Sequence, residues 1–330
     1  MNNLKKIGLT ALAGSLVATS VFAGELAVTG SATLELAHVN GGAANAGKSF
    51  SQGNSVTLSG GGELDNGMTV ALSFELDDGA HGGVAAAGSN DLSLWDSHSL
   101  TIGMNDMGTF TFSGHGGSSA SSAVDDTTGE IWDYQGTTTD PSTGSTKNNM
   151  MSYNNSSLMD GLSITASYVP HTGTATGKQF DSTVDYAVAY SGVEGLVVGY
   201  ANGENKTGAL ATHADVTTMY ANYTMGPIKV AYHTNDYETS SAADTSDQDF
   251  SAYSLSYTIS ENLSVMYGNA TMETSTITTD LDQEISGLAV SYTAGGMGIA
   301  ISTGTIDNAG YASATTADEE WWEIDLSFAF

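Results

Sequence analysis

Apolar and polar side chains alternate along most of this chain. Within residues 26–36, for example, Leu34 and Leu36 alternate with Thr33 and Glu35. Side chains of an extended chain point to opposite faces in turn, so this period of two predicts β-strands. Each strand would have one apolar and one polar face.

The second and third alternating segments form a predicted hairpin. Val56–Leu64 and Met68–Leu76 are joined by Asp65-Asn66-Gly67, a sequence typical of tight turns. The same arrangement recurs to the end of the chain. The predicted strands lie at residues 26–36, 56–64, 68–76, 100–102, 110–112, 151–153, 162–168, 184–190, 196–200, 219–223, 228–232, 253–257, 263–267, 288–292, 299–301 and 322–330. These are sixteen, and the even number suits closure into an antiparallel transmembrane barrel.

The connections alternate in length. Tight turns are followed by long polar segments, which we predict to be loops: Asn40–Asn54, Asp77–Ser97, Gly114–Asn148, Pro170–Ser182 and Asn235–Asp249. Short turns at one end and long loops at the other are typical of outer-membrane barrels. The predicted fold class is therefore all-β, a 16-stranded antiparallel transmembrane barrel.

The N-terminal segment, residues 1–23, reads as a cleaved secretion signal. It has two lysines, then the apolar run Ile7–Ala18, and it ends in small residues suited to a signal peptidase. The apolar run is too short for a membrane-spanning helix, which needs about 20 residues. We expect the mature chain to begin at Gly24 and residues 24–330 to form one barrel domain.

The composition restricts which kinds of membrane-spanning structure the chain can form. There are no cysteines, 3 prolines and 40 glycines, and no mature segment approaches a continuous apolar stretch of helix-spanning length. A membrane protein without such helices must be a closed barrel, because lipid cannot satisfy the hydrogen bonds of a free sheet edge. The chain is therefore expected to fold without disulfides or transmembrane helices.

The charge is strongly negative. The formal net charge is −30, no arginine is present, and loss of the two signal lysines makes it −32. Nucleic-acid binding is excluded as a function, because phosphates require clusters of cationic side chains.

A soluble β-sandwich or a secreted adhesin would also alternate. Two features favour the barrel. Tyrosines recur near the ends of predicted strands, where an interfacial aromatic girdle would lie, and the chain ends on a strand at Phe330.

Three segments carry a resemblance to a known family. Glu25–Leu36, Gly108–Phe112 and Trp322–Phe330 resemble Gram-negative general porins, especially the 16-stranded trimeric type of marine and phototrophic alphaproteobacteria. The resemblance implies a homotrimer in the outer membrane, surrounded by lipid and lipopolysaccharide. It also implies passive diffusion of small hydrophilic solutes and ions. The terminal alternating residues look like the signal read by the barrel-assembly machinery: Trp322, Ile324, Leu326, Phe328 and Phe330.

The resemblance also implies a pore constriction made by the third long loop, Gly114–Asn148. Its acids are Asp125, Asp126, Glu130, Asp133 and Asp140. Family members oppose such acids with wall arginines, which this chain lacks, and we expect only Lys229, placed mid-strand, to face the lumen there. Carboxylates lining a pore favour cations, so we expect a cation-preferring channel. The alternative is that these acids are solvated and do not affect flux.

Other motifs are weak. Gly42–Ser49 matches a phosphate-binding loop, but no helix pattern follows it. Asp96-Ser97-His98 contains triad residues, but neighbours in a strand face opposite ways. We therefore expect no enzymatic activity and no cofactor, apart from a weak calcium candidate at Asp244, Asp247 and Asp249.

One functional alternative remains open from the sequence. The barrel could be a substrate-specific channel, or a structural or adhesive protein. Trp132 and Tyr134, in the predicted constriction loop, give a slight indication of a sugar-specific channel.

Overall fold

A computed structural model describes most of the chain. The described residues are 26–41, 47–77, 96–121, 148–170, 172–174, 177–180, 182–205, 213–239, 247–275, 282–311 and 318–330. No helix within these ranges is long and apolar enough to cross a membrane.

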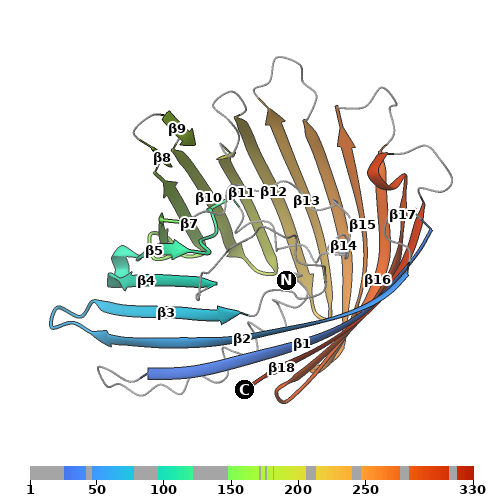
Figure 1. Ribbon diagram of the computed structural model, residues 1–330, viewed down its shortest axis with the longest axis horizontal. Helices are drawn as coiled ribbons and strands as arrows, with labels where there is room; N and C mark the ends of the chain where they lie inside the picture. Colours follow the sequence, from blue (N-terminus) through green and yellow to red (C-terminus); the bar gives the residue numbers. More distant parts are fainter. Residues whose placement is uncertain are drawn as a thin grey trace.

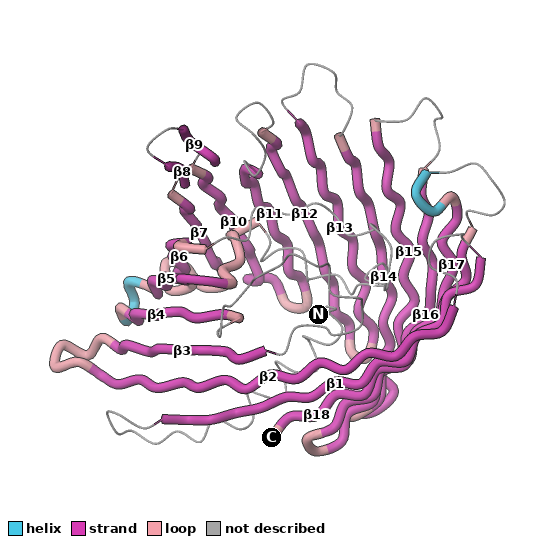
Figure 2. The backbone as a smooth tube through the Cα atoms, viewed as in Figure 1, coloured by secondary structure: helices cyan, strands magenta, loops and turns pink. Residues whose placement is uncertain are grey.

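Sixteen strands form one closed antiparallel barrel, so the predicted fold class and strand number are confirmed. Each barrel strand pairs with the next one along the chain, and β1 also pairs with β18 to close the sheet (Figures 1 and 2). The first eight strands of the chain are β1 (Leu26–Gly41), β2 (Gly47–Glu63), β3 (Thr69–Asp77), β4 (Ser97–Gly103), β5 (Thr109–His115), β6 (Met150–Asn155), β7 (Leu162–Val169) and β8 (Thr172–Thr174). The others are β9 (Gly177–Phe180), β10 (Thr183–Val193), β11 (Leu196–Asn205), β12 (Ala214–Met225), β13 (Ile228–Thr239), β14 (Gln248–Ser260), β15 (Leu263–Thr274), β16 (Gln283–Ala294), β17 (Met297–Asp307) and β18 (Glu319–Ala329). Strands β8 and β9 form a separate small hairpin.

The two ends of the barrel differ as the sequence predicted. Tight turns join β2–β3, β4–β5, β6–β7, β10–β11, β12–β13, β14–β15 and β16–β17. The β4–β5 turn is a 3-10 helix, η1 (Asn105–Met107), and Gly108 after it has φ +90°, a left-handed conformation that favours glycine. A second 3-10 helix, η3 (Ala309–Tyr311), follows β17 at the loop end. Both the first residue of β1 and the last of β18 lie at the turn end, since β1 and β18 run antiparallel to each other.

Several predicted loops are shorter in the structure, which corrects the sequence prediction. β2 already begins at Gly47 and β13 continues to Thr239, so much of the predicted loops 40–54 and 235–249 is strand. These extensions carry polar residues on their outer faces, for example Lys48 and Asp236. Strand pairing continues there beyond the apolar band. The strand residues in these extensions therefore do not show the alternation of apolar and polar side chains that identifies a strand in the sequence. The 170–182 loop contains the β8–β9 hairpin.

The residues of the phosphate-binding motif that the structure describes are strand residues. Gly47, Lys48 and Ser49 open β2 and pair with Val39, His38 and Ala37 of β1. A strand offers no helix N-terminus for a phosphate.

Candidate functional site: the lumen wall

Register and exposure assign each barrel side chain to one of two faces. On β1, Glu35 and Ala37 are buried, with 5% and 2% of their surface exposed, whereas Leu34 and Leu36 are each 43% exposed. Directly paired residues of antiparallel strands share a face, so this assignment continues round the whole barrel. The face of Leu34 is the apolar outer face, and the face of Glu35 lines the lumen.

The outer face has an apolar band with tyrosines. The tyrosines on this face are Tyr153, Tyr168, Tyr186, Tyr190, Tyr200, Tyr223, Tyr232, Tyr253, Tyr257, Tyr267 and Tyr292. They all lie on β6 to β16. Tyrosine and tryptophan rings favour the membrane–water interface, so this part of the surface suits lipid.

Acidic residues are also placed on the outer face, near the loop end. They pair with one another across strands: Asp215 with Glu204 and Glu238, Asp249 with Asp236 and Glu273, and Asp307 with Glu284. We call these residues the outer acidic belt. Carboxylates are costly in hydrocarbon, so the belt marks the upper limit of the lipid-facing band.

The lumen face of the described strands is acidic. Its acids are Glu35, Glu63, Glu75, Asp77, Asp185, Glu319, Glu323 and Asp325, and Lys229 is its one lysine within the described strands. The fixed charge of the described lumen wall is therefore predominantly negative, although Glu35, Asp185, Glu319, Glu323 and Asp325 are each at most 8% exposed.

Three of these acids meet where the first and last strands join. Glu35 of β1 is paired with Asp325 of β18, and Glu323 is on the same face one step along. One carboxylate oxygen from each lies within 4.8 Å of the other two. We call Glu35, Glu323 and Asp325 the seam triad. Glu35 lies just past the midpoint of β1, and the three side chains are at most 8% exposed.

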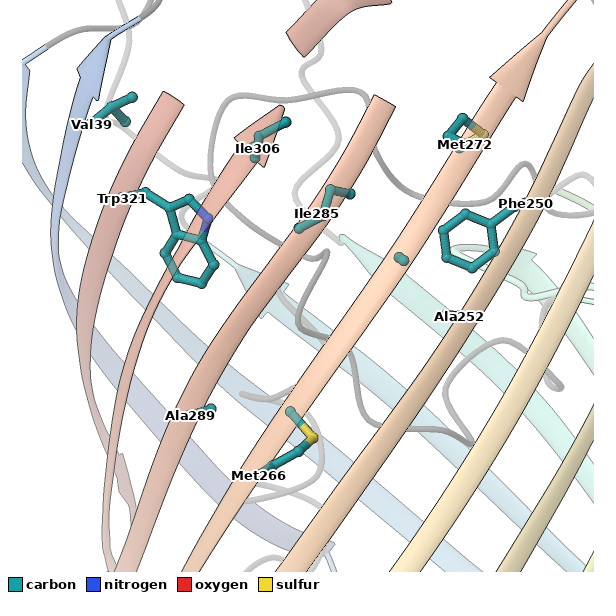
Figure 3. Packing of buried hydrophobic residues seen from close by; sticks show 10 residues of the cluster. Val39, Phe250, Ala252, Met266, Met272, Ile285, Ala289, Ile306 and Trp321 are labelled. Atoms are coloured by element: carbon teal, nitrogen blue, oxygen red, sulfur yellow. The ribbon is translucent and has the colours of Figure 1, made fainter. Parts of the chain in front are cut away.

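An apolar cluster occupies the lumen face of β14 to β18 and β1. Val39, Phe250, Ala252, Met266, Ala270, Met272, Ile285, Ala289, Ile306 and Trp321 pack together, and each is at most 9% exposed. Figure 3 shows these side chains on neighbouring strands of one sheet face. The alternating sequence pattern predicts a polar inner face throughout, and this sector is an exception. Apolar packing on both faces makes the period of two harder to read there.

The chain after β5 runs along the inner wall, on the side where the family resemblance places a constriction loop. Ala120 N donates a hydrogen bond to Ser167 Oγ of β7 (2.9 Å). The Ala120 side chain is 1% exposed and packs with Ala187, Ala201 and Tyr220, on the lumen faces of β10, β11 and β12. Residues 116–121 therefore cross from β5 along the inner wall. The predicted constriction acids Asp125, Asp126, Glu130, Asp133 and Asp140, and also Trp132 and Tyr134, lie outside the described residues.

Lys229 is on the lumen face, as predicted, but it lies closer to the turn end of the barrel than the predicted mid-strand position. It is the second residue of β13 and is paired with Thr224 of β12 and Ser256 of β14. It therefore lies beside the tight turn and not mid-strand. The β12–β13 turn at Gly226-Pro227 is short, so the strand begins directly before Lys229.

A family model described as Gram-negative porin matches residues 8–296 of the chain. The chain belongs to the Gram-negative porin family.

Solved porins share the fold at low sequence identity. The anion-selective porin of Comamonas acidovorans superposes with a TM-score of 0.70 at 15% identity, covering 93% of this chain and 100% of that one. The Salmonella typhi OmpF complex with daunomycin gives 0.70 at 14% identity, covering 93% and 98%. The trimer form of Vibrio cholerae OmpT gives 0.67 at 14% identity, covering 94% and 100%. A search of curated proteins found no match. The porin is thus an outer-membrane β-barrel and a diffusion channel.

The terminal strand of the porin carries the proposed assembly residues on one face. Trp322, Ile324, Leu326 and Phe328 are paired with His38, Leu36, Leu34 and Ala32, all on the outer face of β1. Phe330 follows β18 and exchanges two backbone hydrogen bonds with Gly30, of 2.7 and 3.0 Å. Their placement is consistent with an exposed signal, and their role in assembly stays a prediction.

The predicted calcium residues do not form one described group. Asp244 lies outside the described residues. Asp247 Oδ1 accepts hydrogen bonds from the backbone N and Oγ1 of Thr239, at 2.7 and 2.8 Å. Asp249 belongs to the outer acidic belt. Calcium binding there stays a prediction.

The Asp96-Ser97-His98 motif is split between faces as predicted. Ser97 faces the lumen, and its hydroxyl donates to Glu75 Oε2 (2.9 Å). His98 is paired with Phe74 on the outer face, where the two rings stack with centroids 6.3 Å apart. Ser97 and His98 therefore do not form a catalytic pair.

Proposed function

We propose that this porin is a passive channel for small hydrophilic solutes and ions, that it prefers cations, and that it has no catalytic activity. The observation that carries the proposal is the charge of the lumen face, with eight described acids and one lysine. Acidic rings in a narrow aqueous pore attract cations and repel anions.

Selectivity does not follow from the fold. A structural neighbour with the same barrel is described as anion-selective. The proposal of cation preference therefore depends on this chain's own side chains. We assign it to the seam triad and to the constriction acids Asp125, Asp126, Glu130, Asp133 and Asp140. Lys229 would oppose them only weakly, because it lies at the turn end.

Liposome swelling distinguishes general diffusion from specific transport. We expect uncharged sugars to enter porin-containing liposomes at rates that fall with molecular size and rise linearly with concentration. Protein-free liposomes are the control. Saturation by one sugar would favour the substrate-specific alternative, and no swelling with any solute would favour a structural or adhesive barrel.

We also propose that the porin is a homotrimer whose contact face is the outer surface of β1 to β5. This face has no tyrosines, in contrast with β6 to β16. It contains an apolar groove of about 490 Å³ at the turn end, lined by Leu58, Gly60, Gly62, Val70, Leu72 and Phe74. Two outward glycines lower the surface so that side chains of a second copy can enter. A neighbouring porin fold is described as a trimer form, which supports the proposal.

A lysine in this groove tests the trimer face. Leu72 and Leu288 are both outward and both 45% exposed, but Leu288 lies on β16 among the tyrosines. We expect Leu72→Lys to convert trimers to monomers in mild detergent, since an unpaired charge would be buried between copies. Leu288→Lys should remain trimeric. Size-exclusion chromatography with light scattering gives the readout, and a trimeric Leu72→Lys porin would place the contact face elsewhere.

The membrane partners follow from the same outer surface. We propose that lipid covers the tyrosine-bearing sector and that the outer acidic belt lies at the level of lipopolysaccharide headgroups. Belt carboxylates cannot pair directly with lipid phosphates, so calcium bridging, including at Asp249, is the form of contact that this chemistry favours. The barrel-assembly machinery remains the proposed partner of the terminal strand.

A further inference from the structure

One buried carboxylate joins the inward segment after β5 to the barrel wall. Asp185 lies on the lumen face of β10 and is 2% exposed. Its Oδ2 accepts a hydrogen bond from Ser121 Oγ (3.1 Å), and its Oδ1 accepts one from the backbone N of Glu204 on β11 (3.0 Å). The two oxygens therefore connect the inward segment to the wall.

The neighbouring contacts fix the same segment. Ser119 Oγ lies 3.0 Å from Ser121 Oγ, and Ala120 N donates to Ser167 Oγ at 2.9 Å. All three residues of the segment are at most 2% exposed. Hydrogen bonds to an ionised acceptor are roughly twice as strong as neutral ones, so Asp185 is the strongest of these attachments.

The barrel wall is closely packed against the hydrogen bond between Ser121 and Asp185. A Cβ at Gly203 of β11 would lie 2.6 Å from Asp185 Cγ and 2.7 Å from Ser121 Oγ. Residue 203 must therefore be glycine for the segment to lie this close. β5 and β10 are three strand spacings apart, about 14 Å, so the segment reaches Asp185 only by crossing the inner wall.

We propose that Asp185 is the positioning residue of the pore. Its carboxylate holds residues 119–121 against the inner wall, and their position there limits the free width of the channel beside β7, β10 and β11. The proposal rests on the proposed channel function, which it deepens. Asp185 acts through the loop and does not itself need to contact permeating ions.

The labelling rate of a single cysteine introduced at position 120 measures how firmly residues 119–121 are held to the wall, and it does not depend on ion flow. The chain has no cysteine of its own, and the Ala120 side chain is 1% exposed. We expect Ala120→Cys to react slowly with a water-soluble maleimide. Adding Asp185→Ala or Ser121→Ala should raise the rate about tenfold, the factor implied by loss of one hydrogen bond to a charged group.

The matched control is Asp215→Ala, which removes an exposed acid from the outer face of β12, two strands from β10. It should leave the labelling rate within about twofold of the Ala120→Cys parent. Asp185→Asn keeps the shape and an acceptor oxygen, so it should fall between the parent and Asp185→Ala. If Asp185→Ala does not fold, Ser121→Ala tests the same bond with the carboxylate intact.

Single-channel recordings in planar bilayers then connect the attachment to the pore. We expect Asp185→Ala and Ser121→Ala to change the open conductance and increase its fluctuations, and their double variant to change it no further. Unchanged labelling in both variants, or changed labelling with wild-type conductance, would overturn the proposal. A wild-type protein that labels as expected but does not conduct would instead contradict the channel function.

Discussion

Deletion of Phe330 is expected to prevent most of the porin from accumulating as a folded barrel in the outer membrane. Phe330 and Gly30 exchange two backbone hydrogen bonds at the turn end of the β1–β18 junction. A Cβ at Gly30 would lie 2.5 Å from Phe330 Cε2, so the ring occupies space that only glycine leaves open. The deletion removes both hydrogen bonds and the exposed terminal ring together.

Two substitutions separate these contributions. Phe330→Ala keeps the backbone pairing and removes the ring, whereas Gly30→Val keeps the ring but obstructs its position. If a terminal aromatic is the assembly signal, Phe330→Ala should fail nearly as badly as the deletion. Gly30→Val should then assemble but unfold at a lower temperature, because the ring is displaced.

The readout is the amount of heat-modifiable, folded porin in outer-membrane fractions. Tyr253→Ala is the control, since Tyr253 is also an exposed aromatic on the outer face but lies on β14, away from the proposed contact face of β1 to β5. Porin refolded in detergent should tolerate Phe330→Ala better than cells do. Wild-type amounts of folded porin from the deletion would show that the terminal residue is not needed for assembly.

Neutralising the seam triad is expected to weaken cation preference strongly. The change is Glu35→Gln, Glu323→Gln and Asp325→Asn in one variant. At a separation of about 5 Å and an effective dielectric constant near 20, a cation and one carboxylate attract each other by about 3.3 kcal/mol. A cation beside the triad would be attracted on this scale by each carboxylate, before screening.

A control with the same change in net charge separates lumen effects from overall charge. Asp215→Asn, Asp249→Asn and Glu273→Gln remove three acids from the outer acidic belt, on the lipid side of the sheet. The triad variant should lower the cation-to-anion permeability ratio, and the belt variant should leave it nearly unchanged. Equal effects of the two would mean that net charge and not lumen placement controls selectivity. A third variant, with Asp125, Asp126, Glu130 and Asp133 neutralised, measures the contribution of the loop.

The strands of this porin were predictable because each has an apolar outer face. Leu34 and Leu36 of β1 show the period of two directly in the sequence, and the strand number followed from it. The loop boundaries were less predictable. At Lys48 and Asp236 the outer face has left the hydrocarbon region, so strand pairing persists without an apolar pattern.

The functional residues were harder to find, since they depend on contacts between distant strands. Glu35, Glu323 and Asp325 were visible as polar positions in the first and last strands. Barrel closure makes these strands neighbours, but only the register brings the three carboxylates together.

The Asp185 attachment gave no sequence signal at all. Ser121 is 64 residues from Asp185, and serines near a long loop are common. For Lys229, the alternation predicted correctly that the side chain faces the lumen. Its position along the barrel axis was not predictable, because it depends on where the β12–β13 turn ends.

The most direct test of this account is the zero-current potential of the wild-type porin between unequal KCl solutions in a planar bilayer. We expect the sign that indicates potassium permeating faster than chloride. We also expect the preference to fade as ionic strength rises, because the Debye length shortens from about 10 Å at 0.1 M to about 3 Å at 1 M. A potential of the opposite sign, or one near zero at low salt, would contradict the central claim that the acidic lumen wall selects cations.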